Sequence, residues 1–413
     1  MNRNSVWMAG VATAALLLSG SMASAADGGS GTSSSAVAQA NVRIDDLNTR
    51  IESLEAELQA AETRAATDHD TVGATATSVG QAWWNNTQIS GRMYFDVSHV
   101  EQDVNGVRSG VNNGTGFDIK RFYIGIDHKF DDTFSANVTT DFLYDSTTGA
   151  NQIYIKKAYL QAKVSDALVF RLGSTDLPWI PFVEDTYGFR YIENTLIDHL
   201  KYGTSADWGA HVSGKLYDGV LNYAVSVVNG AGYKKANLFR TNGPDVEGRV
   251  NLNVDHFIVG VGGYWGKLGV QFGSALHHEA TRFDAIAAYE PDNFKVGVEY
   301  FEAQNFLSVS SATQTDHAAG VSGFASWTFM PQWTVFGRYD YAKRKTNALV
   351  PVSVPDNYYN AGIEWNPIKI VDLSLVYKHE DASHGTFSTS NGTIGGSVNG
   401  NYDEIGLFGQ LRW

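Results

Sequence analysis

The sequence contains no cysteine, which excludes disulfide bonds and metal sites built on thiolates. Proline is scarce, at 8 residues, whereas glycine reaches 42 and aromatic residues 12% of the chain, a composition that fits neither a disordered chain nor a collagen. Beyond residue 25 no run of 18 apolar residues occurs, so no membrane-spanning helix is expected there. Basic residues number 30 against 44 acidic ones, and an acidic chain of this kind is not expected to bind nucleic acid.

The first 25 residues have the features of a secretory signal peptide. Arg3 provides the positive charge, "VWMAGVATAALLL" the apolar core, and "ASA" at Ala23 to Ala25 the small-residue cleavage site. The alternative, a transmembrane helix, is disfavoured because the core is too short and the cleavage site follows it directly. We therefore expect export, and leave residues 1–25 out of the fold.

Residues 36–66 repeat with a heptad period and are followed by a polar linker at 67–88. The apolar positions that alternate as a and d are Val37, Ala40, Ile44, Leu47, Ile51, Leu54, Leu58 and Ala61. The narrow apolar seam with charged outer faces predicts a short coiled coil that assists an oligomer, with Arg50 placed to pair with Glu55 of a neighbouring helix. A single amphipathic helix lying on the rest of the protein is the alternative.

From residue 89 onward the helical period is replaced by alternation of apolar and polar residues. In "FKVGVEY", for example, Phe294, Val296 and Val298 lie on one face of an extended strand, and Lys295 and Glu299 on the other. Sixteen such segments occur, near residues 89–98, 117–130, 134–144, 153–164, 167–174, 205–216, 220–229, 245–254, 257–266, 282–290, 294–302, 320–329, 333–342, 358–366, 371–378 and 404–413.

The connections between these segments alternate between short and long. Seven short ones fall at 131–132, 165–166, 218–219, 255–256, 291–293, 330–332 and 366–369. Eight long, polar ones fall at 99–116, 145–152, 175–204, 230–244, 267–281, 303–319, 343–357 and 379–403. Short turns at one end and long loops at the other are typical of a transmembrane β-barrel. The sequence thus predicts an all-β fold, a 16-stranded antiparallel transmembrane barrel over residues 89–413, preceded by the short helical coiled coil.

A lipid bilayer explains this alternation. Backbone groups cannot stay unpaired in hydrocarbon, so the strands must close into a ring, with apolar faces toward lipid and polar faces around a water-filled lumen. Closure requires the last strand, "IGLFGQLRW", to pair with the first, near "ISGRMYFDV". Two aromatic girdles are expected. They comprise Phe130, Phe134, Phe257, Phe294, Phe329, Trp333, Trp365 and Trp413 on the short-turn side, and Tyr144, Tyr154, Tyr300, Tyr341, Tyr359 and Tyr377 on the loop side.

The same alternation predicts which charged residues line the lumen. The inward basic residues are Arg121, Lys129, Lys157, Lys163, Arg171, Lys215, Arg249, Lys295, Arg338 and Arg412; the inward acids are Asp127, Asp141, Glu247, Glu299, Asp340, Glu364 and Glu404. One interpretation is a basic track opposed by acids, which sets a transverse field. The other is a wet wall whose mixed charges only serve solvation. Lys156 falls on the outward face and needs to snorkel or to lie at a subunit contact.

The third long connection is the candidate constriction loop. Its "PWIPF" stretch combines two prolines that stiffen the chain with Trp179 and Phe182, which would either anchor the loop on the inner wall or offer a sugar-binding face. Its charged candidates are Glu184, Asp185, Arg190 and Glu193.

Residues 168–230 carry a family resemblance. This stretch runs from "LVFRLGSTDLPWIPFVEDTYGFRYIENTLIDHL" to "LNYAVSVVNG" and resembles the phosphate-selective porins O and P, with a strand, a proline-bearing inserted loop and a strand pair ending in "NG". The resemblance implies a trimeric channel in the outer membrane of a Gram-negative bacterium, with the third loop folded inward as a constriction. Phosphate-specific members line that constriction with arginine and lysine. Here the loop holds Asp176, Glu184, Asp185, Glu193 and Asp198 against Arg190 and Lys201, which argues against anion selectivity and more strongly against phosphate specificity.

Three functions remain to be compared. A passive diffusion channel for small hydrophilic solutes or ions is favoured, with an anion- or phosphate-selective channel as its variant. A barrel-embedded hydrolase would use His199 or His211, but no G-x-S-x-G or other catalytic motif is present. A structural or adhesive barrel would need a plugged lumen, and residues 67–88 are too few for a plug. "HHE" at 277–279 has no spaced partner ligands, so neither a metal nor a cofactor is expected. The expected partners are outer-membrane lipid, solutes and two further copies of the chain, with the coiled coil in the periplasm.

Overall fold

The computed structural model describes residues 42–43, 45–61, 63, 83–108, 113–145, 150–235 and 240–413, with the side chains of 143–145, 150 and 151 left aside. Two units are distinguished, residues 1–81 and 82–413. In the first, all the described residues are helical, which confirms a helix within the predicted coiled coil. Its apolar side chains Leu47, Ile51, Leu54 and Leu58 are 51–62% exposed. The expected signal peptide (1–25), residues 36–41 and 64–66, and linker residues 67–82 lie outside the described part.

The second unit is built almost entirely from strands. They are β1 (Thr87–Val104), β2 (Val107–Arg108), β3 (Gly114–Lys129), β4 (Phe134–Asp145), β5 (Ala150–Ser165), β6 (Leu168–Asp176), β7 (Ala206–Leu216), β8 (Leu221–Val228), β9 (Asp245–Val254), β10 (Phe257–Gly266), β11 (Ala280–Tyr289), β12 (Phe294–Gln304), β13 (Thr315–Met330), β14 (Trp333–Asn347), β15 (Val352–Ile368), β16 (Val371–Thr389) and β17 (Gly392–Arg412). The short helices are α2 (Ile180–Tyr187), α3 (Leu196–His199), η1 (Tyr217–Gly219) and η2 (Tyr233–Lys235). None of the helices within the described ranges is long and apolar enough to cross a membrane.

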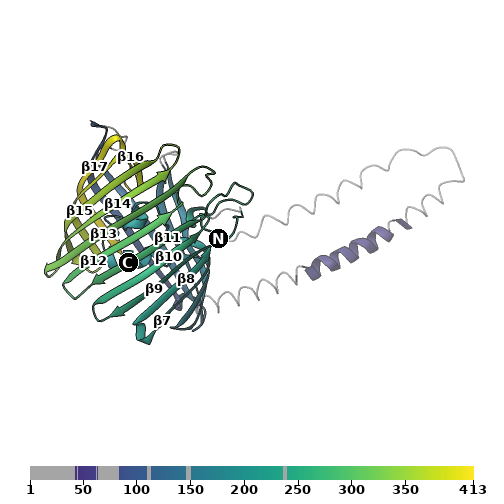
Figure 1. Cartoon of the computed structure of the whole chain (residues 1–413). Helices are drawn as coiled ribbons and strands as arrows, with labels where there is room; N and C mark the ends of the chain where they lie inside the picture. Colours follow the sequence, from purple (N-terminus) through teal and green to yellow (C-terminus); the bar gives the residue numbers. More distant parts are fainter. Residues whose placement is uncertain are drawn as a thin grey trace, which may run out of the picture. The chain divides into compact units, whose positions relative to one another are not determined.

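Sixteen long strands close into an antiparallel barrel, as predicted (Figure 1). β2 is a two-residue continuation of the β1 hairpin. Each long strand pairs with its neighbour in the chain, and β17 pairs with β1 from Arg412 opposite Arg92 to Gly400 opposite Val104. Every long strand therefore has a paired strand on each side, although β3 pairs with β4 only from Ile124 to Lys129. The predicted pairing of the last strand with the first is confirmed.

The last residue fits into the closing seam. Trp413 exchanges two backbone hydrogen bonds with Gly91, at 3.0 and 3.1 Å. A Cβ atom on Gly91 would lie 1.9 Å from the Trp413 ring, so only glycine leaves room for the indole here. The ring also lies 5.9 Å from that of Phe122.

One end of the barrel has the seven short connections that the sequence predicts; we call it the turn end, and the opposite end the loop end. Three predictions at the loop end are wrong. Residues 99–116, 343–357 and 379–403, expected as long loops, are mostly strand. Only 348–351 and 390–391 connect β14 to β15 and β16 to β17. These extensions pair with neighbouring strands but carry too few apolar residues for a clear alternation, so the alternation criterion did not detect them.

The outer face of the strands is apolar and exposed, as expected for a surface in contact with lipid. On β12, Phe294, Val296, Val298 and Tyr300 are 38–45% exposed and alternate with buried or half-buried residues. At the turn end, Trp333 and Trp365 stack with ring centroids 6.0 Å apart. In the expected loop-end girdle Tyr154 is misplaced, because it pairs with inward Asp141, while the side chain of Tyr144 is outside the described set.

The inner face divides into two halves, which corrects the expectation of a uniformly polar lumen. From β3 to β9 it carries lysine, arginine, asparagine and acids. From β11 to β17 it also carries buried Phe301, Phe324, Phe336 and Phe408, which are part of one apolar cluster with the connection between β6 and β7.

Lys156 faces inward, which corrects its predicted outward position. The register of β4 and β5 shifts between Thr139 and Thr140, so that Lys157 pairs with Thr139 and Ile155 with Thr140, and Lys156 is the extra residue. A β-bulge of this kind changes the face on which the following side chains lie. Lys156 and Lys157 are consecutive, and both line the interior.

Candidate functional site

The connection between β6 and β7, residues 177–205, lies inside the barrel against the inner wall; we call it the inserted loop. Trp179 is fully buried. Its backbone N–H donates to Oε1 of Glu247 at 2.9 Å, and its indole N–H donates to Oε1 of Glu299 at 3.0 Å. Trp179 is therefore an anchor of the loop, because a fully buried indole offers no face to a sugar.

Two further polar contacts fix the middle of the inserted loop. The Tyr191 hydroxyl donates to Oε1 of Glu364 at 2.7 Å and lies 2.6 Å from the Ser374 hydroxyl. Arg338 donates from Nη1 to the carbonyl oxygen of Asn194 at 2.5 Å, and it is also paired with Asp340. Such contacts satisfy backbone and side-chain groups that would otherwise be buried without partners.

Aromatic packing on the β11–β17 half complements these hydrogen bonds. Phe189 stacks on Phe336 with ring centroids 4.3 Å apart, and Tyr187 meets Phe324 edge-on at 5.5 Å. Each fully buried side chain of this size contributes about 1.5–3 kcal/mol. The inserted loop is thus held firmly on one side of the barrel, and the open space lies on the other.

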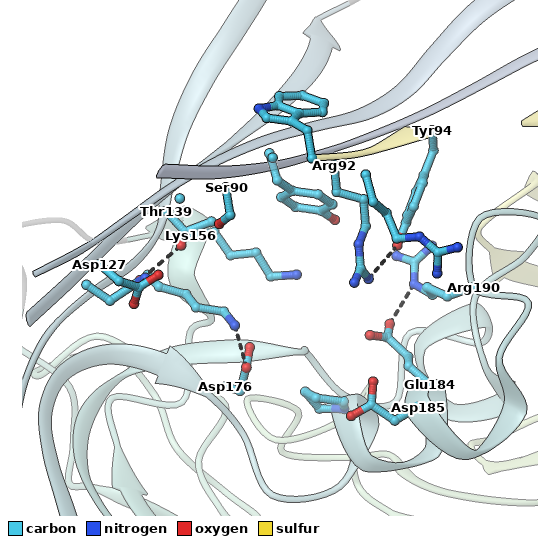
Figure 2. Close-up of a pocket in the computed structure, with 18 of the residues that line it drawn as sticks. Ser90, Arg92, Tyr94, Asp127, Thr139, Lys156, Asp176, Glu184, Asp185 and Arg190 are labelled. Carbon is cyan, nitrogen blue, oxygen red and sulfur yellow. Dashed lines mark hydrogen bonds and ion pairs between the residues drawn. The ribbon is translucent and has the colours of Figure 1, made fainter. Parts of the chain in front are cut away.

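The open space centres on a cavity of about 530 Å³ between the inserted loop and strands β1, β3 and β5. We call it the central cavity. Arg92 and Lys156 extend into it from the wall, and Asp176, Glu184 and Asp185 face them from the opposite side (Figure 2). Positive and negative side chains thus face each other across water-accessible space.

Most of the loop-side carboxylates are already neutralised by partners. Asp176 lies 2.5 Å from Nζ of Lys157, and Arg190 contacts Glu184 at 2.5 Å and Asp198 at 3.5 Å. Asp185 has no ion pair among the described residues, and burial, Glu184 and Asp176 raise the pKa of its carboxyl. The acids that the sequence places in this loop therefore leave little free negative charge.

Some wall cations are paired as well, such as Arg121 with Asp141 and Lys163 with Asp166, but the two that extend into the central cavity are not paired with any described carboxylate. Within the described part of the chain, no carboxylate comes within 4 Å of the charged groups of Arg92 or Lys156. Arg92 donates to the Tyr94 hydroxyl at 3.3 Å. The Lys156 ammonium lies 4.8 Å from the ring centroid of Tyr123 and 6.0 Å from that of Tyr233. Aromatic faces stabilise a cation without neutralising it, so both charges remain available to an anion.

Two further cavities continue this basic surface. Toward the loop end, a cavity of about 230 Å³ is lined by five cations, Arg121, Lys156, Arg190, Lys234 and Lys235, and one carboxylate, Asp198. Toward the turn end, a cavity of about 510 Å³ is lined by Lys163, Arg171, Lys215 and Arg249 with Asp166. Lys156, Tyr123 and Arg190 line both the central and the loop-end cavity.

The predicted lining residues therefore fall into two groups. Those on the open wall are Arg121, Lys157, Lys163, Arg171, Lys215, Arg249 and Arg412, with Lys129 on the rim of the turn end. Those covered by neighbouring residues are Asp141, Glu247, Glu299 and Arg338, with Lys295 paired to Glu290.

Within the inserted loop, Glu184, Asp185 and Arg190 line the central cavity. Phe182 packs under the Arg249 guanidinium, 4.1 Å from its ring centroid, and Glu193 is buried beside Lys378. Sequence reasoning missed Arg92, whose strand was not assigned a face, Lys156, which is displaced by the bulge, and Lys234.

His199 lies in a cluster that resembles a Ser-His-Glu triad. Its Nδ1 is 2.5 Å from the Ser390 hydroxyl, and its Nε2 is 2.9 Å from Oε1 of Glu380. Burial alone would lower the pKa of His199, but Glu380 and Glu193 outweigh it and raise the pKa to about 10. A raised pKa makes the imidazole a poor acceptor for a serine proton at neutral pH, so the surroundings of His199 disfavour the hydrolase alternative. His211, the other candidate, contacts Ser226 and the Gly173 carbonyl.

Comparison with solved structures places this fold among outer-membrane porins. The anion-selective porin of Comamonas acidovorans matches with a TM-score of 0.58 and 12% identity over 79% of this chain and 99% of that one. The outer-membrane channel DcaP of Acinetobacter baumannii gives 0.56 and 11%, over 79% and 97%. The trimer form of OmpT of Vibrio cholerae gives 0.54 and 13%, over 79% and 99%. A scan against protein-family models and a search of curated proteins found no match. At these identities the likeness concerns the fold alone: a closed porin-type barrel.

Proposed function

We propose that this chain is an outer-membrane porin, a passive diffusion channel for small hydrophilic solutes that is narrowed by the inserted loop. A closed barrel with an apolar outer face and water-accessible cavities inside supports this proposal. The lumen is not packed shut, because the apolar cluster occupies one side of it and charged residues line the other. The fold shared with solved porins agrees with it.

We further propose that the channel prefers anions. The observation that carries this proposal is the row of unpaired cations on the β1–β9 wall, from Lys234 through Lys156 and Arg92 to Arg171. Charged rings and ladders at the narrow part of a pore set its ion preference. The acids of the inserted loop are mostly paired, so their negative charge does not cancel the positive charge of this row. From the sequence alone each of them would contribute a full negative charge.

Purified protein in a planar bilayer tests both proposals. Stepwise conductance is expected in potassium chloride, and a tenfold salt gradient should give a reversal potential of the sign that marks chloride as the more permeant ion. A silent bilayer, from protein whose circular dichroism shows folded strands, would refute the channel. A cation-selective reversal potential would refute only the anion preference.

Phosphate is a narrower candidate within this proposal. The resemblance of residues 168–230 to phosphate-selective porins motivates it, while Glu184 and Asp185 in the central cavity oppose a doubly charged anion. Adding phosphate to the same bilayer in chloride should reduce the chloride current at millimolar concentration if phosphate binds. An unchanged current would leave a general anion channel.

We also propose that the protein is a homotrimer. Residues 1–25 would be removed on export, and residues 36–66 would form a coiled coil in the periplasm. The exposed row of Leu47, Ile51, Leu54 and Leu58, spaced four, three and four residues apart, supports the coiled coil. The trimer form of a solved neighbour supports the oligomer. Chemical cross-linking of the full mature chain, compared with a chain that lacks 36–66, measures how much the helix contributes to assembly.

A further inference from the structure

The end of the β16–β17 hairpin folds back into the barrel. Residues 386–394, which we call the hairpin tip, were expected in a surface loop, yet Phe387 is 1% and Ile394 0% exposed. Both belong to the apolar cluster that contains the inserted loop, together with Val354 of β15. The tip has one buried face, with Phe387, Thr389 and Ile394, and one exposed face, with Thr386 and Ser388.

Glycines form the bend from which the tip departs. The pairing of β16 with β17 shifts between Ser383 and Gly385, where Gly385 has φ +152° and faces Gly396. Gly395 has φ +105°, and a Cβ atom there would lie 2.3 Å from the Gly385 carbonyl oxygen. Such backbone angles and such a close approach are available to glycine alone.

The tip rests directly on α3 of the inserted loop. The Ser390 N–H donates to the His199 carbonyl oxygen at 2.8 Å, and the Ser390 hydroxyl contacts His199 Nδ1 and Glu193 Oε1, each at 2.5 Å. Lys201, after α3, donates to the Ser388 hydroxyl at 3.1 Å.

The root of the same hairpin holds the same loop. Glu380 of β16 accepts hydrogen bonds from His199 at 2.9 Å and from the tip's Asn391 at 2.8 Å. Lys378 bridges Glu193 of the loop, at 3.3 Å, and Glu404 of β17, at 3.0 Å. His199, Glu193, Lys378 and Glu380 are all at most 5% exposed, so these charges are shielded from water and strongly coupled.

We propose that the hairpin tip is a clamp that positions the inserted loop, so that the open width of the lumen is set by two segments rather than one. Two residues of the tip position the loop: Ser390 through its contact with His199, and Phe387 through the apolar cluster. The consequence for permeation rests on the proposed channel function, whereas the clamp itself does not.

The absence of cysteine from the chain provides a direct test. Thr195, at the start of α3, is 2% exposed, and Thr195→Cys introduces a single, nearly isosteric thiol. In this background, residues 386–395 are replaced by Asn-Gly, which joins the paired Gly385 and Gly396 by a two-residue turn. The matched control replaces residues 348–351 of the neighbouring β14–β15 hairpin by Asn-Gly, since Leu349 and Val350 there are fully or largely exposed.

The rate at which a small methanethiosulfonate reagent modifies the thiol is measured in folded, detergent-solubilised protein. With the hairpin tip removed we expect modification to be at least about tenfold faster, because local opening of the loop then costs less free energy. The control variant should react like the parent. Equal rates in all three proteins would overturn the clamp, whether or not the protein conducts.

Bilayer recordings of the same proteins test the effect on permeation. Loss of the tip should raise single-channel conductance and add rapid flicker between sublevels. A second variant, His199→Cys with Ser390→Cys, should conduct steadily when oxidised and flicker when reduced, since a disulfide replaces the lost contact. A conducting tip-deleted variant with unchanged conductance and noise would overturn the role of the clamp in setting the width.

Discussion

The indole N–H of Trp179 donates a 3.0 Å hydrogen bond to Glu299, across 120 residues of sequence and with both side chains at most 1% exposed. This single contact joins the start of the inserted loop to β12. Both partners are removed from water, so loss of the donor would leave a buried carboxyl group without its hydrogen bond, which costs about 1–3 kcal/mol.

Replacing Trp179 by phenylalanine should therefore lower the unfolding temperature of the barrel, measured by circular dichroism in detergent. The matched control is Trp265→Phe, because the Trp265 indole also donates to a glutamate, Glu279 at 2.8 Å, but in an exposed position. That substitution should cost less than about 1 kcal/mol. Equal losses in the two variants would contradict the anchoring role of Trp179.

Lys156→Gln should weaken the anion preference. A unit charge about 4 Å from a permeating ion in water contributes about 1 kcal/mol, so the chloride-to-potassium permeability ratio should fall by about fivefold. Reversal potentials in a salt gradient measure this ratio. Lys343→Gln, which removes a charge from the exposed outer face of β14, should leave it unchanged. A similar shift in both variants would mean that net charge, and not position, sets the preference.

Gly91→Ala should impair closure of the barrel. The new methyl group would lie 1.9 Å from the Trp413 ring, and relief of such overlap typically costs about 1–3 kcal/mol. The yield of folded barrel on refolding, read from heat-sensitive migration on gels, should fall. Gly323→Ala serves as the control, because its Cβ atom would meet nothing within 4 Å. Adding Trp413→Ala to Gly91→Ala should recover part of the yield.

The contact between His199 and Glu380 should fail at alkaline pH. The pKa of His199 is raised from 6.5 to about 10, so the stabilisation from its protonated form is complete below pH 6.5 and is lost as the pH rises through 10. The stabilisation that Glu193 contributes has the opposite pH dependence. Burial opposes ionisation, but Lys378 and His199 hold its pKa well below 4.5, so its stabilisation is lost only in strong acid.

Current noise should accordingly stay constant up to about pH 6.5 and increase progressively as the pH rises from there to about 10. His199→Gln should show the increased noise at neutral pH and no further alkaline transition. His317→Gln is the control, because His317 pairs with Glu302 on the exposed outer face. An alkaline transition of the same size in His199→Gln would assign it to another group.

Alternation of side chains was sufficient to predict the barrel, because each membrane-facing strand obeys one physical constraint. Phe294, Val296 and Val298 must be apolar when they face outward, and their period of two follows from the pleat. The criterion fails where strands extend beyond the lipid-facing part of the barrel. Residues 379–403 lie mostly in paired strands, but apolar residues such as Phe387 and Ile394 are too few there to alternate, so the sequence indicated a loop.

The site was harder to predict, because its geometry depends on contacts that are distant in sequence. The residues next to Arg338 in the sequence do not indicate that it donates to the Asn194 carbonyl oxygen. The bulge that directs Lys156 inward is visible only in the register of β4 and β5. The charge of the inserted loop could be counted from the sequence, whereas its neutralisation by Lys157 and Arg190 could not.

The barrel wall is divided between two tasks. Strands β11–β17 hold the inserted loop through buried aromatic rings, and strands β1–β9 present solvated cations. Exchange of a cation such as Lys215, which has no ion pair and no cation–π contact among the described residues, disturbs less packing than exchange of a buried ring, so selection can retune solute preference on the second half while the architecture persists. Divergent descendants of such a gene should therefore vary fastest around Lys215 and slowest around Phe324 and Phe336.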